Sequence, residues 1–405
     1  MPNSQRITWA PVSDVGDVRM GKQLSPASRA HGRQYPYLRV ANVLEGHIDY
    51  SDVKTMGFSD RELEIYGLLP GDILLNEGQE SLNMVGRSAI YHGKPAQYFF
   101  QNTLIRFRPG TMVNPRYAHH VFVWWRRTGV FARTAEKTSI SHLGATRFAR
   151  LEFPLVPLSD QREIVRVLET LERAEACVMN SFQKLEALRS AFLSSLNVSK
   201  SAPQRTLSDV LAYAPQNGLY KPASAYTPTG TPIVRIDSFS GGPSNLAEGL
   251  QRIETSGEER SHYGIHEGDI LINRVNTPGL VGKSTMVKKI SEPTIFESNI
   301  MRCKIDQSQA RPRFIEAWLS TETARSYFRT HAKSAISQAS INQQDVLACP
   351  IPDMTLPQQD TFLKQIKFVD ACLSSDEAEL VKLRNLKDGL MDDLLSGRVA
   401  VPEVE

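Results

Sequence analysis

The chain has 405 residues, of which 41% are apolar, 22% charged and 8% aromatic, and its formal net charge is +3. That length predicts about two to four domains with ordinary folded cores. The sequence contains no run of about 18 apolar residues, which is the length needed to span a membrane. The first residues lack the apolar segment of a signal peptide. The four cysteines are far apart and form no zinc or disulfide pattern, which favours a reducing cytoplasm.

The near-neutral total hides an uneven distribution of charge. Residues 1–157 carry a net charge of +6, residues 158–200 are neutral, residues 201–354 carry +1 and residues 355–405 carry −4. Between residues 101 and 150 there are nine basic residues and one acidic residue, Glu136. Such a stretch favours a polyanionic partner, although an ordinary solvated basic face has the same composition.

Residues 1–157 are predicted to form a compact α+β domain. Short β-type runs at 72–75, 89–91 and 104–107 alternate with residues that favour turns. A helix is expected from Pro115 to Arg133, where the strand pattern is interrupted.

Residues 158–200 are predicted to form one long helix. Ser159 is a suitable N-cap, and neither proline nor glycine occurs from there to Asn197. Apolar residues recur every seven positions, which is the spacing of a coiled-coil seam. This seam comprises Ile164, Leu171, Val178, Leu185 and Phe192.

Residues 201–354 repeat the pattern of the first domain. The segment YGLLPGDILLN at 66–76 corresponds to YGIHEGDILIN at 263–273, and shorter matches follow in the same order. A second copy of the α+β domain is therefore expected, with a helix from Pro312 to Thr330.

Residues 355–405 are predicted to form a second long helix and a tail. Its seam comprises Phe362, Val369, Leu383 and Leu390. Because each helix leaves its domain at an equivalent place, the two are expected to form an antiparallel coiled coil with one domain at each end and a pseudo-two-fold axis. A single amphipathic surface helix is the alternative, but about 57 Å of helix exceeds the length of such a domain. The acidic charge of this block is expected to face protein partners.

No catalytic constellation is present in the sequence. The segment 279–285 resembles a phosphate-binding P-loop, but Thr277 stands where its first glycine is required. His119, His120 and His142 have no carboxylate or cysteine at metal-ligand spacing. We therefore predict a binding protein with no catalytic residue and no metal site.

Polar and basic residues in corresponding loops of the two domains are candidates for DNA contacts, because such side chains bind phosphates and base edges. In the first domain the candidates are Gln79, Glu80, Ser81, Arg87, Lys137, Thr138, Ser139, Ser141 and His142. In the second domain they are Arg274, Asn276, Thr277, Lys283, Lys333, Ser334, Ser337 and Gln338. Ordinary surface loops are the alternative interpretation. The two sets differ in detail, as expected if each domain reads different bases.

The duplicated order of motifs resembles the specificity (S) subunits of type I restriction–modification systems. The resemblance covers nearly the whole chain and rests on seven segments: GDILLNEG at 71–78, GDILIN at 268–273, ISHL at 140–143, ISQ at 336–338, PLVPLSDQREI at 154–164, PIP at 350–352 and LLSGRV at 394–399. No single motif is decisive, and the second helix junction departs from the first after Asp360.

The resemblance implies two target-recognition domains that each read one half of a split double-stranded DNA site, with helix length setting the spacer. It implies two methyltransferase (M) subunits that use S-adenosylmethionine to methylate adenine N6, and restriction (R) subunits that cleave DNA. The S chain itself would hold no cofactor and perform no catalysis. The main alternative is a stand-alone bipartite DNA-binding defence or regulatory protein without methyltransferase partners. A self-contained enzyme and a coiled-coil scaffold without a DNA role are the others.

Overall fold

The computed structural model describes residues 7–79, 84–137, 141–196, 205–239, 244, 246, 249–334 and 337–400. The chain forms two compact units. The first unit comprises Met1–Met179 together with Ala378–Glu405, and the second comprises Asn180–Glu377. Each unit therefore contains one α+β domain and a part of both long helices.

The first unit is built around an antiparallel sheet with the strand order β2-β9-β5-β7. These strands are Gly16–Met20, Leu104–Pro109, Ile73–Asn76 and Ser88–Ile90. A second sheet has the order β4-β3-β8, with Lys54–Gly57, Gln34–Leu38 and Phe99–Phe100. Strand β1 (Thr8–Pro11) pairs with β12 (Glu152–Leu155), which directly precedes the first long helix.

The helices of the first domain are short, and the predicted helix from Pro115 to Arg133 is divided in two. They are α1 (Val12–Val15), α2 (Pro26–Ala30), α3 (Asp60–Tyr66), α4 (Pro115–Arg127), α5 (Val130–Thr134) and α6 (Ala145–Ala149). The division falls at Gly129, whose φ of +77° lies in the left-handed region, where a continuous right-handed helix is impossible. The prediction of one helix here was wrong.

The second unit repeats this plan. Its larger sheet has the order β13-β21-β17-β19, with Gln216–Asn217, Ile300–Cys303, Ile270–Asn273 and Ser284–Met286. Its other four-stranded sheet has the order β14-β16-β15-β20, with Tyr226–Thr227, Gln251–Ile253, Thr231–Val234 and Ile295–Phe296.

The helices of the second domain include α8 (Gly257–Tyr263), α9 (Pro312–Leu319), α10 (Glu322–His331) and α11 (Gln343–Leu347). The predicted helix from Pro312 to Thr330 is also divided. Thr321 begins a new helix here, because its hydroxyl accepts a hydrogen bond from the backbone N–H of Ala324 and so acts as an N-cap.

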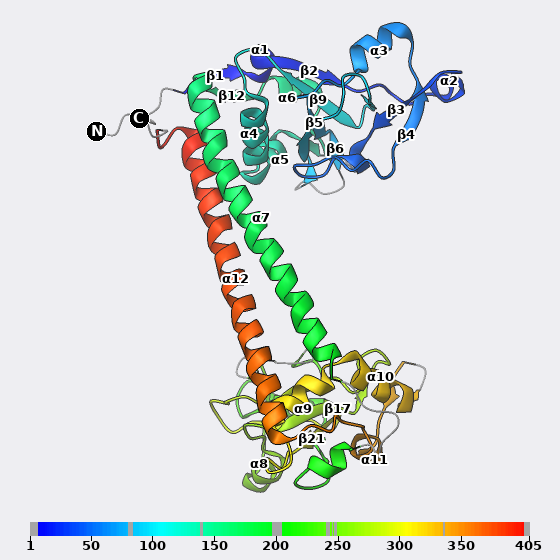
Figure 1. Ribbon diagram of the computed structural model, residues 1–405, viewed down its shortest axis with the longest axis vertical. Coiled ribbons are helices and arrows are strands. Elements are labelled where there is room, and N and C mark those ends of the chain that lie inside the picture. The colour runs from blue at the N-terminus through cyan, green and yellow to red at the C-terminus, as the bar shows by residue number, and fades with distance from the viewer. Residues whose placement is uncertain are drawn as a thin grey trace. The chain divides into compact units, whose positions relative to one another are not determined.

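Two long helices dominate the chain: α7 (Leu158–Ser194) and α12 (Leu356–Ser396) (Figure 1). In the first unit, Glu175 of α7 pairs with Arg384 and Lys387 of α12, at 2.7 and 2.6 Å. In the second unit, Arg189 pairs with Asp370 at 2.7 Å. In the first unit Leu168 shares an apolar core with Leu394, and in the second Phe192 packs against the core that contains Phe362. Within each unit, therefore, α7 and α12 pack antiparallel.

Burial varies along the predicted seam of the two helices. Ile164 of α7 is buried in the core of the first unit, whereas Leu171, Val178, Leu185 and Phe192 are half-buried. On α12, Phe362 and Val369 are buried, and Leu383 and Leu390 are half-buried. Residues off the predicted seam, Val165, Met391 and Leu395, are buried as well, because each helix end also packs on an α+β domain.

This architecture confirms the predicted fold class: two similar α+β domains and two long helices that pack together. Within the described ranges, no helix has both the length and the apolar character needed to cross a bilayer.

The buried histidine of α4 makes the stability of the first unit depend on pH. His120 is 5% exposed, and burial, with smaller contributions from His119, Lys387 and Arg116, lowers its pKa to about 3. In an unfolded chain the pKa of histidine is about 6.5, so below that pH only the unfolded state takes up the proton. The free energy of unfolding should therefore fall as the pH is lowered from 6.5.

Between pH 7.5 and pH 5 the wild-type chain should lose free energy of unfolding, and we expect His120→Gln to reduce that loss by up to about 2 kcal/mol. Urea unfolding of the first unit measures the difference. The matched control is His47→Gln, because His47 is exposed. Equal losses in the wild-type chain and in His120→Gln would contradict the prediction.

Candidate nucleic-acid interface

Each unit has one small three-stranded antiparallel sheet beside its larger sheet. In the first unit the order is β10-β11-β6, with Glu136–Lys137, Ser141–His142 and Gly78–Gln79. In the second unit the order is β18-β23-β22, with Val275–Asn276, Ala339–Ser340 and Lys333–Ser334. We call these the first and second polar sheets. Each brings together two segments that are about 60 residues apart in the sequence.

Many of the predicted DNA-contacting residues meet on these sheets. Gln79, Lys137, Ser141 and His142 lie on strands of the first polar sheet, and Asn276, Lys333 and Ser334 lie on strands of the second. Arg274 directly precedes the second polar sheet, Thr277 follows its first strand, and Ser337 and Gln338 precede β23. Four predicted residues, Glu80, Ser81, Thr138 and Ser139, lie outside the described residues.

Arg87 and Lys283 lie at equivalent turns, but their side chains differ in environment. The backbone carbonyls of both residues accept hydrogen bonds at 2.8 Å, from the N–H groups of Asn76 and Asn273. Lys283 is only 8% exposed; its Nζ donates to the carbonyl of Ile236 at 3.0 Å and lies 5.1 Å from the Phe239 ring. Burial lowers its pKa. A phosphate contact by Lys283 would require it to leave this internal position.

The framework that holds each polar sheet is the same in both units. Asn76 and Asn273 end the strands β5 and β17; both are fully buried and donate to the carbonyls of Val43 and Ile236. The guanidinium groups of Arg106 and Arg302 lie over the rings of Phe100 and Phe296, each at 5.6 Å. A side chain repeated in this way, with the same contacts, supports the fold.

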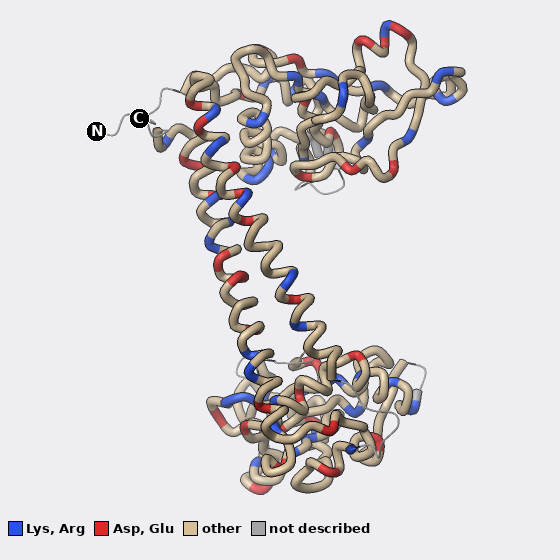
Figure 2. Tube along the Cα trace, viewed as in Figure 1, with Lys and Arg blue, Asp and Glu red and all other residues tan. Residues whose placement is uncertain are grey.

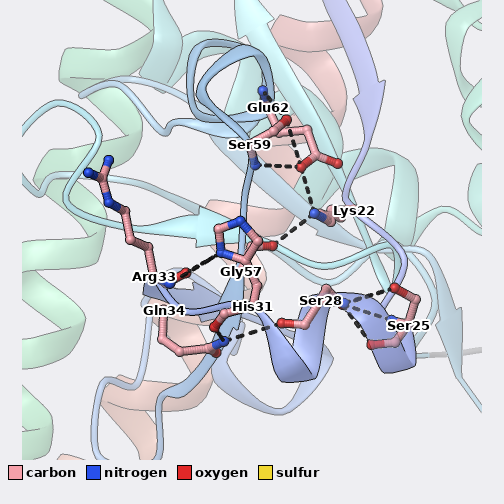
Figure 3. Close-up of polar contacts among 9 residues, drawn as sticks. All are labelled: Lys22, Ser25, Ser28, His31, Arg33, Gln34, Gly57, Ser59 and Glu62. Carbon is pink, nitrogen blue, oxygen red and sulfur yellow. Dashed lines mark hydrogen bonds and ion pairs between the residues drawn. The ribbon is translucent and has the colours of Figure 1, made fainter.

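An ion pair between a lysine and a helix-capping glutamate is also repeated in the two domains, and Figure 3 shows that of the first domain. Lys22 Nζ pairs with Glu62 at 2.6 Å and donates to the carbonyl of Gly57 at 2.8 Å, while Glu62 also accepts from the backbone N–H of Ser59. In the second domain Lys221 pairs with Glu259 at 2.7 Å, and Glu259 accepts from Ser256.

The strand residues of the polar sheets, in contrast, differ between the two copies. Their registers align Gly78 with Val275, Gln79 with Asn276, Glu136 with Lys333, Lys137 with Ser334, Ser141 with Ala339 and His142 with Ser340. Only the Gln79–Asn276 pair keeps the same chemical type. The two units thus share one framework and carry different residue types at its equivalent positions.

The basic stretch of the first domain is largely neutralised by distant acidic residues. Figure 2 shows both basic and acidic residues distributed over the first domain as a whole. Among the described residues, ion pairs join Arg106 with Asp17, Arg108 with Asp72, Arg116 with Glu169, Arg126 with Glu45 and Arg127 with Asp388. Arg106 is 2% exposed. The interpretation of residues 101–150 as one free basic face therefore does not hold.

Both polar sheets have further polar residues at their edges, and sequence reasoning left out several of those beside the second sheet. Glu77 directly precedes β6, and its carboxylate lies 2.8 Å from Nδ1 of His142. In the second unit, a cleft of about 450 Å³ is lined by Asn217, Arg274, Asn342, Gln343, Gln344 and Leu347. The segment 342–344, with three consecutive amide side chains, was a visible signal for this cleft.

Within the described residues, no cluster of three or more His, Cys, Asp or Glu is arranged to hold a metal. Cys303 and Cys349 are buried, and burial raises the pKa of both thiols.

Comparison with known proteins identifies similar chains. Residues 8–187 match the family described as the type I restriction modification DNA specificity domain. The chain is 22% identical to the EcoKI specificity subunit of Escherichia coli K12, over 96% of this chain and 88% of that one. It is 21% identical to the StySPI specificity subunit of Salmonella potsdam, over 96% and 87%.

Solved structures share the fold. A chain from a study of complex assembly and conformational transition in a type I R-M system has a TM-score of 0.62 and 14% identity, with 98% of each chain covered. The S subunit from M. genitalium has a TM-score of 0.54 and 13% identity, covering 100% of this chain and 98% of that one. Residues 8–187 thus match the type I restriction modification DNA specificity domain, and over most of its length the chain is similar to specificity subunits of type I restriction enzymes.

Proposed function

We propose that this chain reads a bipartite site in double-stranded DNA and directs adenine-N6 methylation and cleavage by partner subunits. One observation carries the proposal: the two units share a framework but present different side chains on equivalent polar sheets. Two recognition domains that share a framework but differ in their contacting residues suit a DNA site made of two different half-sequences.

The proposed partners are two methyltransferase subunits, which would hold S-adenosylmethionine, and restriction subunits. The chain itself is proposed to act without a cofactor, without catalysis and in the cytoplasm. Its relatives are specificity subunits of type I restriction enzymes, which supports this division of labour.

A mechanism follows from general nucleic-acid chemistry. Basic side chains would bind backbone phosphates, which makes affinity fall as salt rises. Residues of the polar sheets and their edges would then discriminate base edges in the groove. The target adenine must leave the base stack to reach a methyltransferase pocket, so the bound complex has to permit base flipping.

Deleting the gene from its host and sequencing adenine methylation on single DNA molecules tests the proposal. We expect a bipartite methylated motif that disappears on deletion and returns when the full chain is restored. An unchanged methylation pattern would contradict the proposal. Purification of the tagged chain without any methyltransferase would instead favour a stand-alone DNA-binding protein.

A further inference from the structure

One position at the edge of each polar sheet reverses its charge between the two units. Glu77 follows Asn76 at the end of β5, and Arg274 follows Asn273 at the end of β17. Each is the single residue that joins the larger sheet to the polar sheet of its unit.

The backbones of these two residues are held in the same way. The N–H of Glu77 donates to the carbonyl of Thr103 at 3.0 Å, and its carbonyl accepts from Leu143 at 2.8 Å. The N–H of Arg274 donates to the carbonyl of Asn299 at 2.8 Å, and its carbonyl accepts from Ile341 at 2.9 Å. Because two hydrogen bonds and a buried asparagine fix each backbone, the two side chains start from equivalent places.

The Arg274 guanidinium uses little of its hydrogen-bonding capacity inside the protein. Among the described residues it makes one hydrogen bond, a long one of 3.5 Å from Nη1 to the carbonyl of Ser298, and its Nε is buried without a partner. A guanidinium has five N–H donors in a planar fork. Arg274 lines the polar cleft with Asn217 and Gln344, so its remaining donors adjoin a space that a ligand could enter.

Glu77 presents the opposite chemistry. Its side chain is 13% exposed, and Oε2 lies 2.8 Å from Nδ1 of His142, which is 44% exposed. A carboxylate has about four acceptor sites, so one histidine does not saturate it. The His142 contact orients the group and leaves it able to accept from a ligand donor.

We propose that Glu77 and Arg274 are the equivalent specificity-determining residues of the two domains, with Arg274 reading a guanine edge and Glu77 reading a cytosine amino group. This inference rests on the proposed function. Arginine matches the O6 and N7 acceptors of guanine, and a carboxylate accepts from N4 of cytosine. The same place in the two half-sites would therefore carry base edges of opposite hydrogen-bonding polarity.

The test uses the full chain in complex with its methyltransferase partner. Single-molecule methylation sequencing first defines the wild-type motif, and then the motifs of Arg274→Gln and Glu77→Gln. We expect each variant to change one base position, in opposite halves of the motif. Arg274→Gln should move preference from guanine toward adenine, because a glutamine amide matches the N6 and N7 atoms of adenine.

A substitution series on duplex DNA separates base reading from phosphate binding. Each base pair of the wild-type site is replaced in turn, and the affinity of the purified complex is measured. Arg274→Gln should lose about tenfold or more of the discrimination at one guanine position and little elsewhere. A loss of affinity equal for all substituted sites would assign a phosphate contact and overturn the inference.

Two matched variants control for general effects of the substitutions. Arg252→Gln removes an arginine paired with Glu292 in the second domain, and Glu64→Gln removes an exposed carboxylate in the first. Both should keep the wild-type motif. If Arg274→Gln does not fold, Arg274→Lys, which keeps the charge and the aliphatic stem, is scored by the same series.

The outcomes distinguish this inference from the proposed function. If the wild-type chain directs no bipartite methylation, the proposed function is wrong. If the wild-type motif is bipartite and both variants retain it unchanged, the function stands and the assignment of Glu77 and Arg274 is wrong.

Discussion

Ending the chain at Asp388 is expected to unfold the first unit. The missing segment contains Met391, Leu394 and Leu395, which are buried in the same apolar core as Ile164 and the domain strands. Removing one buried leucine or methionine side chain costs about 2–5 kcal/mol. The loss of three should cost about 6 kcal/mol or more, which is comparable with the whole stability of a domain.

Polar contacts add to this expectation. Trp124 Nε1 donates to Asp392 at 2.6 Å, so the truncation also removes a hydrogen-bond partner of α4. The effect is measured on the truncated chain by thermal unfolding and by limited proteolysis, with cleavage followed within residues 1–179. A chain that ends at Ala400 is the control. Wild-type protection of the first unit in the truncated chain would contradict the prediction.

A pair of single substitutions tests the same contact without truncation. Leu395→Ala, at a site with no exposure, should lower the free energy of unfolding by about 3 kcal/mol. Leu386→Ala on the same helix, at a site 47% exposed, should change it by about 0.5 kcal/mol or less. Similar effects of the two substitutions would show that Leu395 does not support the core.

Deleting one heptad from each long helix is expected to change the spacer of the DNA motif without changing its half-sites. Suitable segments are 178–184 of α7 and 376–382 of α12, because the deletion leaves the ion pairs of Glu175 and Arg189 intact. Seven residues shorten a helix by about 10 Å, close to the rise of three base pairs. Seven residues are nearly two full turns, so the packed face of each helix is kept.

Methylation sequencing of this variant measures the effect. We expect methylation at the original motif to be lost, and any new motif to keep both half-sequences with a shorter spacer. Deleting four residues from each helix is the comparison, because it rotates the packed face by about 40° and should abolish assembly. An unchanged motif with an unchanged spacer after the heptad deletion would contradict the prediction.

The overall fold could be predicted because its signals are local or periodic. The duplication is visible in matching segments such as 66–76 and 263–273, and the long helices are visible in a seven-residue apolar period. The breaks at Gly129 and Thr321 were missed, although each residue has a physical reason to end or begin a helix.

The candidate site was predictable only in outline. The sequence indicated polar loops in each domain, and seven of the predicted residues that the structure describes lie on strands of the polar sheets. It did not reveal that Lys283 is buried, that Glu77 contacts His142, or that Arg274 lines a polar cleft. Burial depends on neighbours such as Ile236 and Phe239, which are more than 40 residues away from Lys283.

The number and order of charged residues follow from the sequence, whereas the pairing of their charges depends on tertiary contacts. The net charge of +3 and the basic stretch at 101–150 are properties of the sequence, as are the duplication and the helix period. The tertiary structure alone decided which of those charges are free. Arg108 meets Asp72 across 36 residues, and Trp124 meets Asp392 across 268. The acidic block at 355–405 likewise pairs within the chain, through Asp360 with Arg311 and Asp370 with Arg189. Local sequence determines which elements form, whereas charge pairing and burial depend on distant segments that only folding brings together.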